Sequence, residues 1–182
     1  MKKSNGDILT DDELKSLLKK DDFVYLYDVD GIEKDKPNLC IYQMISQFYK
    51  MWTDHGPRVL GDVVDSVMAG ATNITLREKL WPKMHIPSVR EITECNIFTE
   101  IKIPHTEIQN IPISTSYNVD GYVLIDNNIK IEKDFQVCSF LKNFCINNKL
   151  YVYESNLKNI SYWKNLGVAG ILVDIDKIKE AH

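Results

Sequence analysis

The sequence has 182 residues, of which 44% are hydrophobic and 26% are charged, and its formal net charge at pH 7 is -4. A chain of this length and composition is expected to form a single domain, residues 1–182, with a buried core, which excludes the disordered, collagen-like and coiled-coil classes. The acidic balance and the lack of a Lys/Arg stripe argue against nucleic acid as a partner, and the polar first residues offer no signal peptide or membrane span, so we expect a cytoplasmic protein.

Short strands and helices alternate along the first part of the chain. A capping box at Thr10–Glu13 opens a helix over residues 10–20, and the apolar run Phe23–Tyr27 is typical of a strand that is buried on both faces. The next predicted elements are a helix over 39–45, a strand over 49–53, a helix over 60–68 and a strand over 73–76. A second capping box, Ser88–Glu91, opens a helix that leads to a strand over 97–101.

The alternation resumes after a polar, proline-containing loop over residues 104–120. Strands are predicted over 122–126, 150–154 and 170–174, and helices over 135–147 and 157–166, the last with a left-handed cap at Gly167. Units in this order predict right-handed crossovers and a parallel α/β sheet, either doubly wound or curled into a barrel. The four cysteines form no CxxC pair, so we expect buried, reduced thiols and no zinc site.

Four segments of the chain carry the pattern of a known family. They are Tyr27–Ile32 followed by Asn38, Trp52–Arg58, Ala69–Ala71, and Leu166–Val173. In this order they resemble the second strand, the third strand and its loop, the turn before the fourth strand, and the start of the eighth strand of the histidine-biosynthesis isomerase and cyclase superfamily, especially its archaeal relatives. The resemblance runs from about residue 23 to 176. It implies a (βα)8 TIM barrel of the ribulose-phosphate-binding kind that acts as a sugar-phosphate isomerase or lyase.

Several features of that family have no counterpart in this chain. The first strand, which carries one of the family's two catalytic aspartates, is missing, and only Glu100 stands near the position of the second. The two phosphate loops are replaced by Glu154–Asn156 and Asp174–Asp176, which contain no glycine and whose carboxylates would repel a phosphate. We therefore expect an incomplete barrel of about seven βα units, whose open side is covered by the N-terminal helix or by a second copy in a homodimer. We also expect no tight binding of phosphoribosyl intermediates of histidine biosynthesis.

Polar side chains at the predicted strand ends are the candidates for chemistry. We expect acid–base catalysis from Asp28, Asp54 and Glu100. The candidates for contacting a substrate are Asp30, His55, Arg58 and Asp126. Carboxylates that meet in one pocket could share a proton or a divalent cation, whereas carboxylates that cap separate helices lie beside backbone amides and share no cavity.

Three functions remain open from the sequence. The first is an enzyme or former enzyme of the sugar-phosphate barrel superfamily, acting on a small molecule with no cofactor and no resident metal. The second is a non-catalytic binding protein derived from that family, which the missing catalytic aspartate and phosphate loops favour. The third is a Mg²⁺-dependent phosphatase, because Asp28–Gly31 also resembles the first motif of the haloacid-dehalogenase type, with Asp28 as nucleophile and Asp30 as general acid. A turn with two capping residues has the same residue pattern.

Overall fold

Seven parallel strands form one sheet in the computed structural model, which describes residues 16–20, 22–103, 118–125 and 135–180. The strands are β1 Phe23–Tyr27, β2 Lys50–Asp54, β3 Ala71–Leu76, β4 Asn96–Glu100, β5 Gly121–Leu124, β6 Leu150–Tyr153 and β7 Gly170–Leu172. Each strand pairs in parallel with the next one in the chain. A consecutive order adds every strand on the same side of the previous one, which curls a twisted sheet into a barrel, whereas a doubly wound sheet reverses its order part-way.

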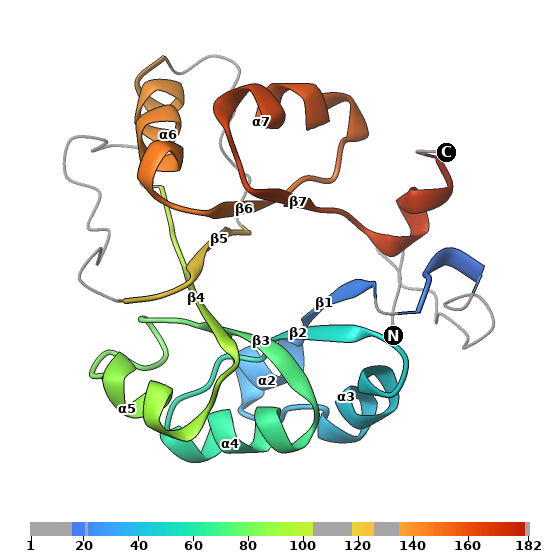
Figure 1. Ribbon diagram of the computed structural model, residues 1–182, viewed down its shortest axis with the longest axis vertical. Coiled ribbons are helices and arrows are strands. Elements are labelled where there is room, and N and C mark those ends of the chain that lie inside the picture. The colour runs from blue at the N-terminus through green and yellow to red at the C-terminus, as the bar shows by residue number, and fades with distance from the viewer. Residues whose placement is uncertain (1–15, 21, 104–117, 126–134, 181–182) are drawn as a thin grey trace.

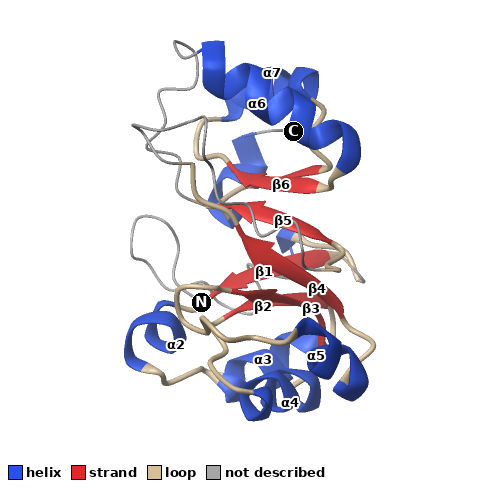
Figure 2. Cartoon of the chain, turned by 90° about the vertical axis from the view of Figure 1, so that its left-hand side faces the viewer, coloured by secondary structure: helices blue, strands red, loops and turns tan. Residues whose placement is uncertain are grey.

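Helices lie between successive strands in the chain. They are α2 Val29–Lys34, α3 Leu39–Ser46, α4 Leu60–Met68, α5 Ile86–Ile92, α6 Phe135–Asn147 and α7 Ile160–Leu166, with 3-10 turns η3 Leu157–Asn159 and η4 Ile175–Glu180. Helices α3, α4 and α5 lie on one side of the strands, and α6 and α7 lie on the opposite side (Figures 1 and 2). None of the helices in the described part of the chain is both long enough and apolar enough to cross a membrane.

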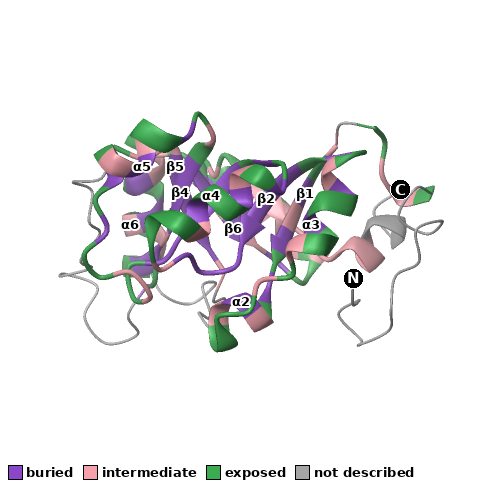
Figure 3. Cartoon of the chain, turned by 90° about the horizontal axis from the view of Figure 1, so that it is seen from below, coloured by how far each residue is buried: buried purple, intermediate pink, exposed green. Residues whose placement is uncertain are grey.

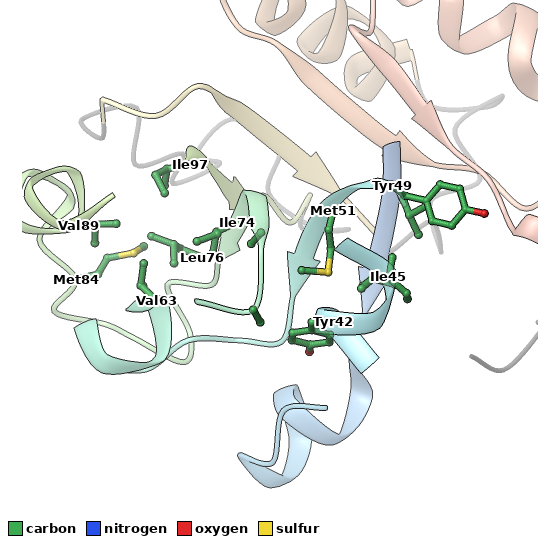
Figure 4. Packing of buried hydrophobic residues seen from close by; sticks show 14 of the residues in the cluster. Tyr42, Ile45, Tyr49, Met51, Val63, Ile74, Leu76, Met84, Val89 and Ile97 are labelled. Carbon is green, nitrogen blue, oxygen red and sulfur yellow. The ribbon is translucent and has the colours of Figure 1, made fainter. Parts of the chain in front are cut away.

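The core has two layers because alternate side chains of a strand face opposite sides of the sheet. Outside the barrel, apolar strand residues pack against the helices, and Figure 4 shows Ile74 and Leu76 of β3 beside Val63 of α4 and Val89 of α5. Inside the barrel, the rings of Trp52 and Phe98 pack with their centroids 4.0 Å apart. The buried strands and the exposed outer faces of the helices are seen together in Figure 3.

The barrel wall has an opening between β7 and β1. Among the described residues no hydrogen-bonded ladder joins these two strands. On β2, the amide of Lys50 donates to the carbonyl of Asp22, and the Asp54 carbonyl accepts from the amide of Asp28 at the other end, both at 2.9 Å. Because every second residue of a parallel strand bonds to the same neighbour, the backbone groups of residues 23, 25 and 27 face the opening. The expected incomplete barrel of seven strands is therefore confirmed.

Most predicted elements are present, with small shifts at their ends, and Gly167 caps α7 in the left-handed conformation with φ 85°. One prediction is wrong, because α5 begins at Ile86, after an N-cap at His85, so that Ser88–Glu91 is not a capping box. The alternative of a turn with two capping residues holds in part, because Asp28 is a cap but helix α2 forms in place of the turn. The cysteines are less buried than expected, because Cys40 is exposed and Cys95, Cys138 and Cys145 are partly exposed. The predicted helix over 10–20 and the loop over 104–120 fall largely outside the described residues.

Candidate functional site

A buried ion cluster lies inside the barrel at the carboxyl ends of β2, β3 and β4. Asp54 and Glu100 are two positions beyond the inward-facing rings of Trp52 and Phe98, so they also face inward. Arg77, directly after β3, lies between them: its Nε and Nη2 donate to the two carboxylate oxygens of Asp54 at 2.8 and 2.7 Å, and its Nη1 donates to Glu100 Oε1 at 2.6 Å. The side chains of Arg77, Asp54 and Glu100 are only 6%, 0% and 9% exposed, respectively.

Two tyrosines of β1 support this cluster. The Tyr25 hydroxyl donates to Asp54 Oδ2, and the ring of Tyr27 lies 5.4 Å from the Arg77 guanidinium carbon. Burial and then the charge of Asp54 raise the pKa of Tyr25 well above its ordinary value, so its phenol stays protonated. Burial alone would lower the pKa of Arg77, but its hydrogen bond to Asp54 and the charges of Asp54 and Glu100 outweigh burial and raise it. Arg77 is therefore a fixed cation at all working pH values.

A pocket of about 530 Å³ opens beside Glu100 and Arg77. Its charged lining comes from Glu33, Arg77, Lys79, Glu100 and Lys102, and its other lining residues are Tyr27, Ile32, Leu80 and Ile125. Glu100 has one oxygen held by Arg77, while Lys102 Nζ lies 3.8 Å from the other, Oε2. A carboxylate that is oriented through one oxygen and borders a pocket with the other can give a proton to, or take one from, a bound molecule.

Asp28 lies on the other side of the sheet, in the layer between β1 and the helices. It shares this side with Leu26 and Val24, two and four positions earlier on β1. Its carboxylate accepts hydrogen bonds from the Gly31 and Asn38 amides, at 3.2 and 2.7 Å, and from the Asn38 side chain and the Tyr42 hydroxyl. Burial opposes ionisation, but these hydrogen bonds outweigh it and lower the pKa of Asp28. Asp28 is thus an ionised helix cap and does not meet Asp54 in one pocket.

Asp30 does not share the side of Asp28, as the strand-end pattern had suggested, because it lies within α2. Its carboxylate pairs with Lys34 one turn later, at 2.7 Å on the exposed face of the helix. Among the described residues no group of three or more His, Cys, Asp or Glu side chains could hold a metal ion. The geometry therefore offers no support for the phosphatase alternative.

His55 and Arg58 hold α2 against the loop after β2. The His55 side chain is buried, its Nε2 lies 2.6 Å from the Ser66 hydroxyl, and burial lowers its pKa, so the ring is neutral. Arg58 donates to the carbonyls of Gly31 and Ile32 at 3.2 and 2.9 Å. A Cβ on Gly31 would lie 2.7 Å from His55, which explains the glycine. Neither His55 nor Arg58 lines the pocket. Asp126 lies outside the described residues.

Comparison with solved structures identifies the architecture. The sequence matches no protein-family model and no curated protein. Phosphoribosyl anthranilate isomerase from Thermococcus kodakaraensis superposes with a TM-score of 0.65 over 91% of this chain and 84% of its own, at 14% identity. The fold is a TIM barrel. Two further solved structures have the same fold. A mutant tryptophan synthase α-subunit from Pyrococcus furiosus superposes with a TM-score of 0.55 over 86% of this chain and 76% of its own, at 12% identity. A putative phosphonomutase from Burkholderia cenocepacia superposes with a TM-score of 0.55 over 93% of this chain and 94% of its own, at 10% identity.

The mouth of this TIM barrel is divided into two polar regions. Opposite the Arg77 cluster, Asp174 accepts a hydrogen bond from the Tyr153 hydroxyl at 2.9 Å. Lys177 Nζ lies 3.6 Å from Asp174 Oδ2. Burial, followed by the hydrogen bond to Asp174, raises the pKa of Tyr153 to about 12. Glu154 faces outward and accepts from the Trp163 indole at 2.8 Å, so it supports α7. The strand-end carboxylates therefore do not form one ring.

Three cations of the pocket, Arg77, Lys79 and Lys102, are missing from the candidates drawn from the sequence. Arg77 could have been found, because it is the first residue after the predicted strand over 73–76 and active sites of a TIM barrel lie at the carboxyl ends of its strands. An arginine at this position is a candidate on the same grounds as the carboxylates at the ends of the neighbouring strands. No feature of the sequence distinguishes Lys79 and Lys102 from lysines that are merely solvated.

Proposed function

We propose that this chain is a TIM-barrel enzyme of the isomerase or lyase type, related to the histidine-biosynthesis isomerase and cyclase superfamily but with a changed activity. The observation that carries the proposal is Glu100, with Oε1 fixed by Arg77 at 2.6 Å and the rest of the carboxylate beside a pocket. Similar solved structures include an isomerase and the α-subunit of tryptophan synthase, which supports this class of reaction.

Glu100 exchanges a proton with a bound small molecule in this proposal. Isomerase and lyase reactions beside a carbonyl group remove a proton from one atom and return it to the same or another atom, and a positioned carboxylate performs both steps. Arg77 orients Glu100, and Asp54, which is fully buried, orients Arg77. Asp54 is therefore a positioning residue, and Asp28 and His55 keep α2 and its loop in place. No cofactor enters the proposal.

The ligand differs from that of the resembled family. Glu154 and Asp174 stand where the family binds phosphate, and their oxygens accept hydrogen bonds from Trp163 and Tyr153. The same observation favours the second candidate function, a non-catalytic binding protein, because loss of the ancestral phosphate contacts leaves a pocket without a demonstrated reaction.

Deuterium uptake from solvent tests proton exchange without knowledge of the net reaction. The full chain is incubated in D2O with a panel of hydroxy, keto and amino carboxylates and sugar phosphates. The mass of each compound is then measured by mass spectrometry. We expect uptake into at least one compound, and Glu100→Gln should slow it by about 10²- to 10⁴-fold, the usual contribution of general acid–base catalysis.

Glu94→Gln, an exposed glutamate away from the pocket, is the matched control and should leave the exchange rate unchanged. Binding of a compound with no deuterium uptake would support the non-catalytic alternative instead. Uptake that survives in Glu100→Gln would remove Glu100 from the mechanism.

A further inference from the structure

The lining of the pocket has two cations that can turn toward a ligand. The charge of Arg77 is directed at Asp54 and Glu100, with which it forms short, buried ion pairs. Lys102 is 58% exposed, and its Nζ is 3.8 Å from Glu100 Oε2, which is too long for a hydrogen bond. Lys79 lines the same pocket from an exposed position. Both lysines can therefore reach a negative group without breaking a buried contact.

The other lining residues suit the uncharged part of a ligand. Tyr27, Ile32, Leu80 and Ile125 present one aromatic ring and three branched aliphatic chains. Tyr27 is 47% exposed, so part of this large aromatic residue is in contact with water. A planar apolar group that packs on this ring would remove it from water.

We propose, building on the proposed function, that the ligand is a small organic monocarboxylate with a planar, apolar body. Its carboxylate lies between Lys79 and Lys102, its body packs on Tyr27 and Leu80, and the atom that exchanges a proton lies next to Glu100.

A phosphate monoester fits this lining less well for two reasons. Glu33 and Glu100 border the same pocket and repel the second negative charge that such an ester carries. Phosphate sites also use free backbone amides or the fork of an arginine, and the Nε–Nη2 edge of Arg77 already holds Asp54.

Three probes with the same ring and different head groups test the head-group choice on the full chain. Isothermal titration calorimetry is run with benzoate, phenyl phosphate and benzamide. We expect benzoate to bind at least about tenfold more tightly than phenyl phosphate, and benzamide to give no binding heat. Equal or tighter binding of phenyl phosphate, or no heat from benzoate, would overturn the inference.

The lysines are tested by Lys79→Met and Lys102→Met, with Lys142→Met on the exposed side of α6 as matched control. Each pocket variant should raise the dissociation constant of benzoate by about 10- to 100-fold, the effect of losing one charge-assisted hydrogen bond, and the control should not change it. Unchanged affinity in both pocket variants would place benzoate elsewhere.

Glu100→Gln separates this inference from the proposed function. It removes a negative charge beside the ligand, so benzoate should bind at least as tightly as to the unaltered protein, while deuterium exchange slows by about 10²- to 10⁴-fold. Selective benzoate binding without any deuterium exchange would defeat the proposed function alone. Deuterium exchange without preference for carboxylate over phosphate would defeat the present inference alone.

Discussion

Arg77 shows how one side chain can decide the electrostatics of a barrel interior. Asp54 and Glu100 are taken out of water, and each would be strongly destabilising without a partner at hydrogen-bonding distance. The guanidinium is planar and has five donors, so it can satisfy two carboxylates from different strands at once. The cluster therefore ties β2, β3 and β4 together at the end where the pocket opens.

Replacing Arg77 by Met should destabilise the fold. The change leaves two buried carboxylates without their cation, and breaking a buried ion pair from one side costs about 3–5 kcal/mol. The free energy of unfolding from urea titrations measures the loss. Lys34→Met, which breaks the exposed pair with Asp30, is the control and should give no measurable change. A similar small effect in both variants would show that the Arg77 cluster contributes little to stability.

Asp28 should make the stability of the fold depend on pH. Hydrogen bonds from Tyr42, Asn38 and Gly31 lower its pKa below the ordinary value of 3.8, although burial acts in the opposite direction. A lowered pKa in the folded state means that the ionised carboxylate stabilises the fold above pH 3.8 and that this contribution is lost as the pH falls through the lowered pKa.

Asp28→Asn should therefore be less stable than the unaltered protein at pH 7, and the difference should shrink as the pH falls below about 4. Urea unfolding at a series of pH values measures this difference. Asp65→Asn, an exposed position of α4, should follow the unaltered protein throughout. A deficit of constant size at every pH would mean that the charge of Asp28 does not stabilise the fold.

Helix α2 is an element that forms because of contacts with distant residues. It has six residues, one of them a glycine, and such a sequence has little helical tendency by itself. Asp28 caps its first turn, and Arg58, in the loop after β2, donates to the carbonyls of its residues Gly31 and Ile32. These contacts bring Ile32 and Glu33 to the pocket. The element thus links the buried cap to the candidate site.

Within the described residues, the opening between β7 and β1 is the main feature at the scale of the whole molecule. The backbone groups of residues 23, 25 and 27 face the opening, and Phe23 on the same strand is 59% exposed. A free strand edge beside exposed apolar side chains is a template for pairing with another chain. We propose that two copies pair through β1 as a homodimer, antiparallel across a two-fold axis.

Sedimentation should then give twice the mass of the 21.1 kDa chain. Phe23→Lys places a charge at the edge and should raise the dimer dissociation constant by at least about tenfold. Phe135→Lys is the matched control, because it makes the same substitution at a phenylalanine of α6 that is 85% exposed, and it should leave the mass unchanged. A monomer at all concentrations would show that β1 is not the contact between copies.

The sequence by itself determined the strands of the described residues, the helices other than α2 and the single parallel α/β architecture. These follow from local patterns, namely apolar runs, helical periodicity and the Gly167 cap, which need no knowledge of distant residues. Tertiary structure alone decided the side of the sheet that each strand-end residue faces and the partner that it finds. Asp28 and Asp54 look alike in sequence, but one bonds to Asn38 and Tyr42 outside the barrel and the other to Arg77 inside it. The reason is physical: successive side chains of a strand face opposite sides of the sheet, and the partners that satisfy a buried charge come from other parts of the chain.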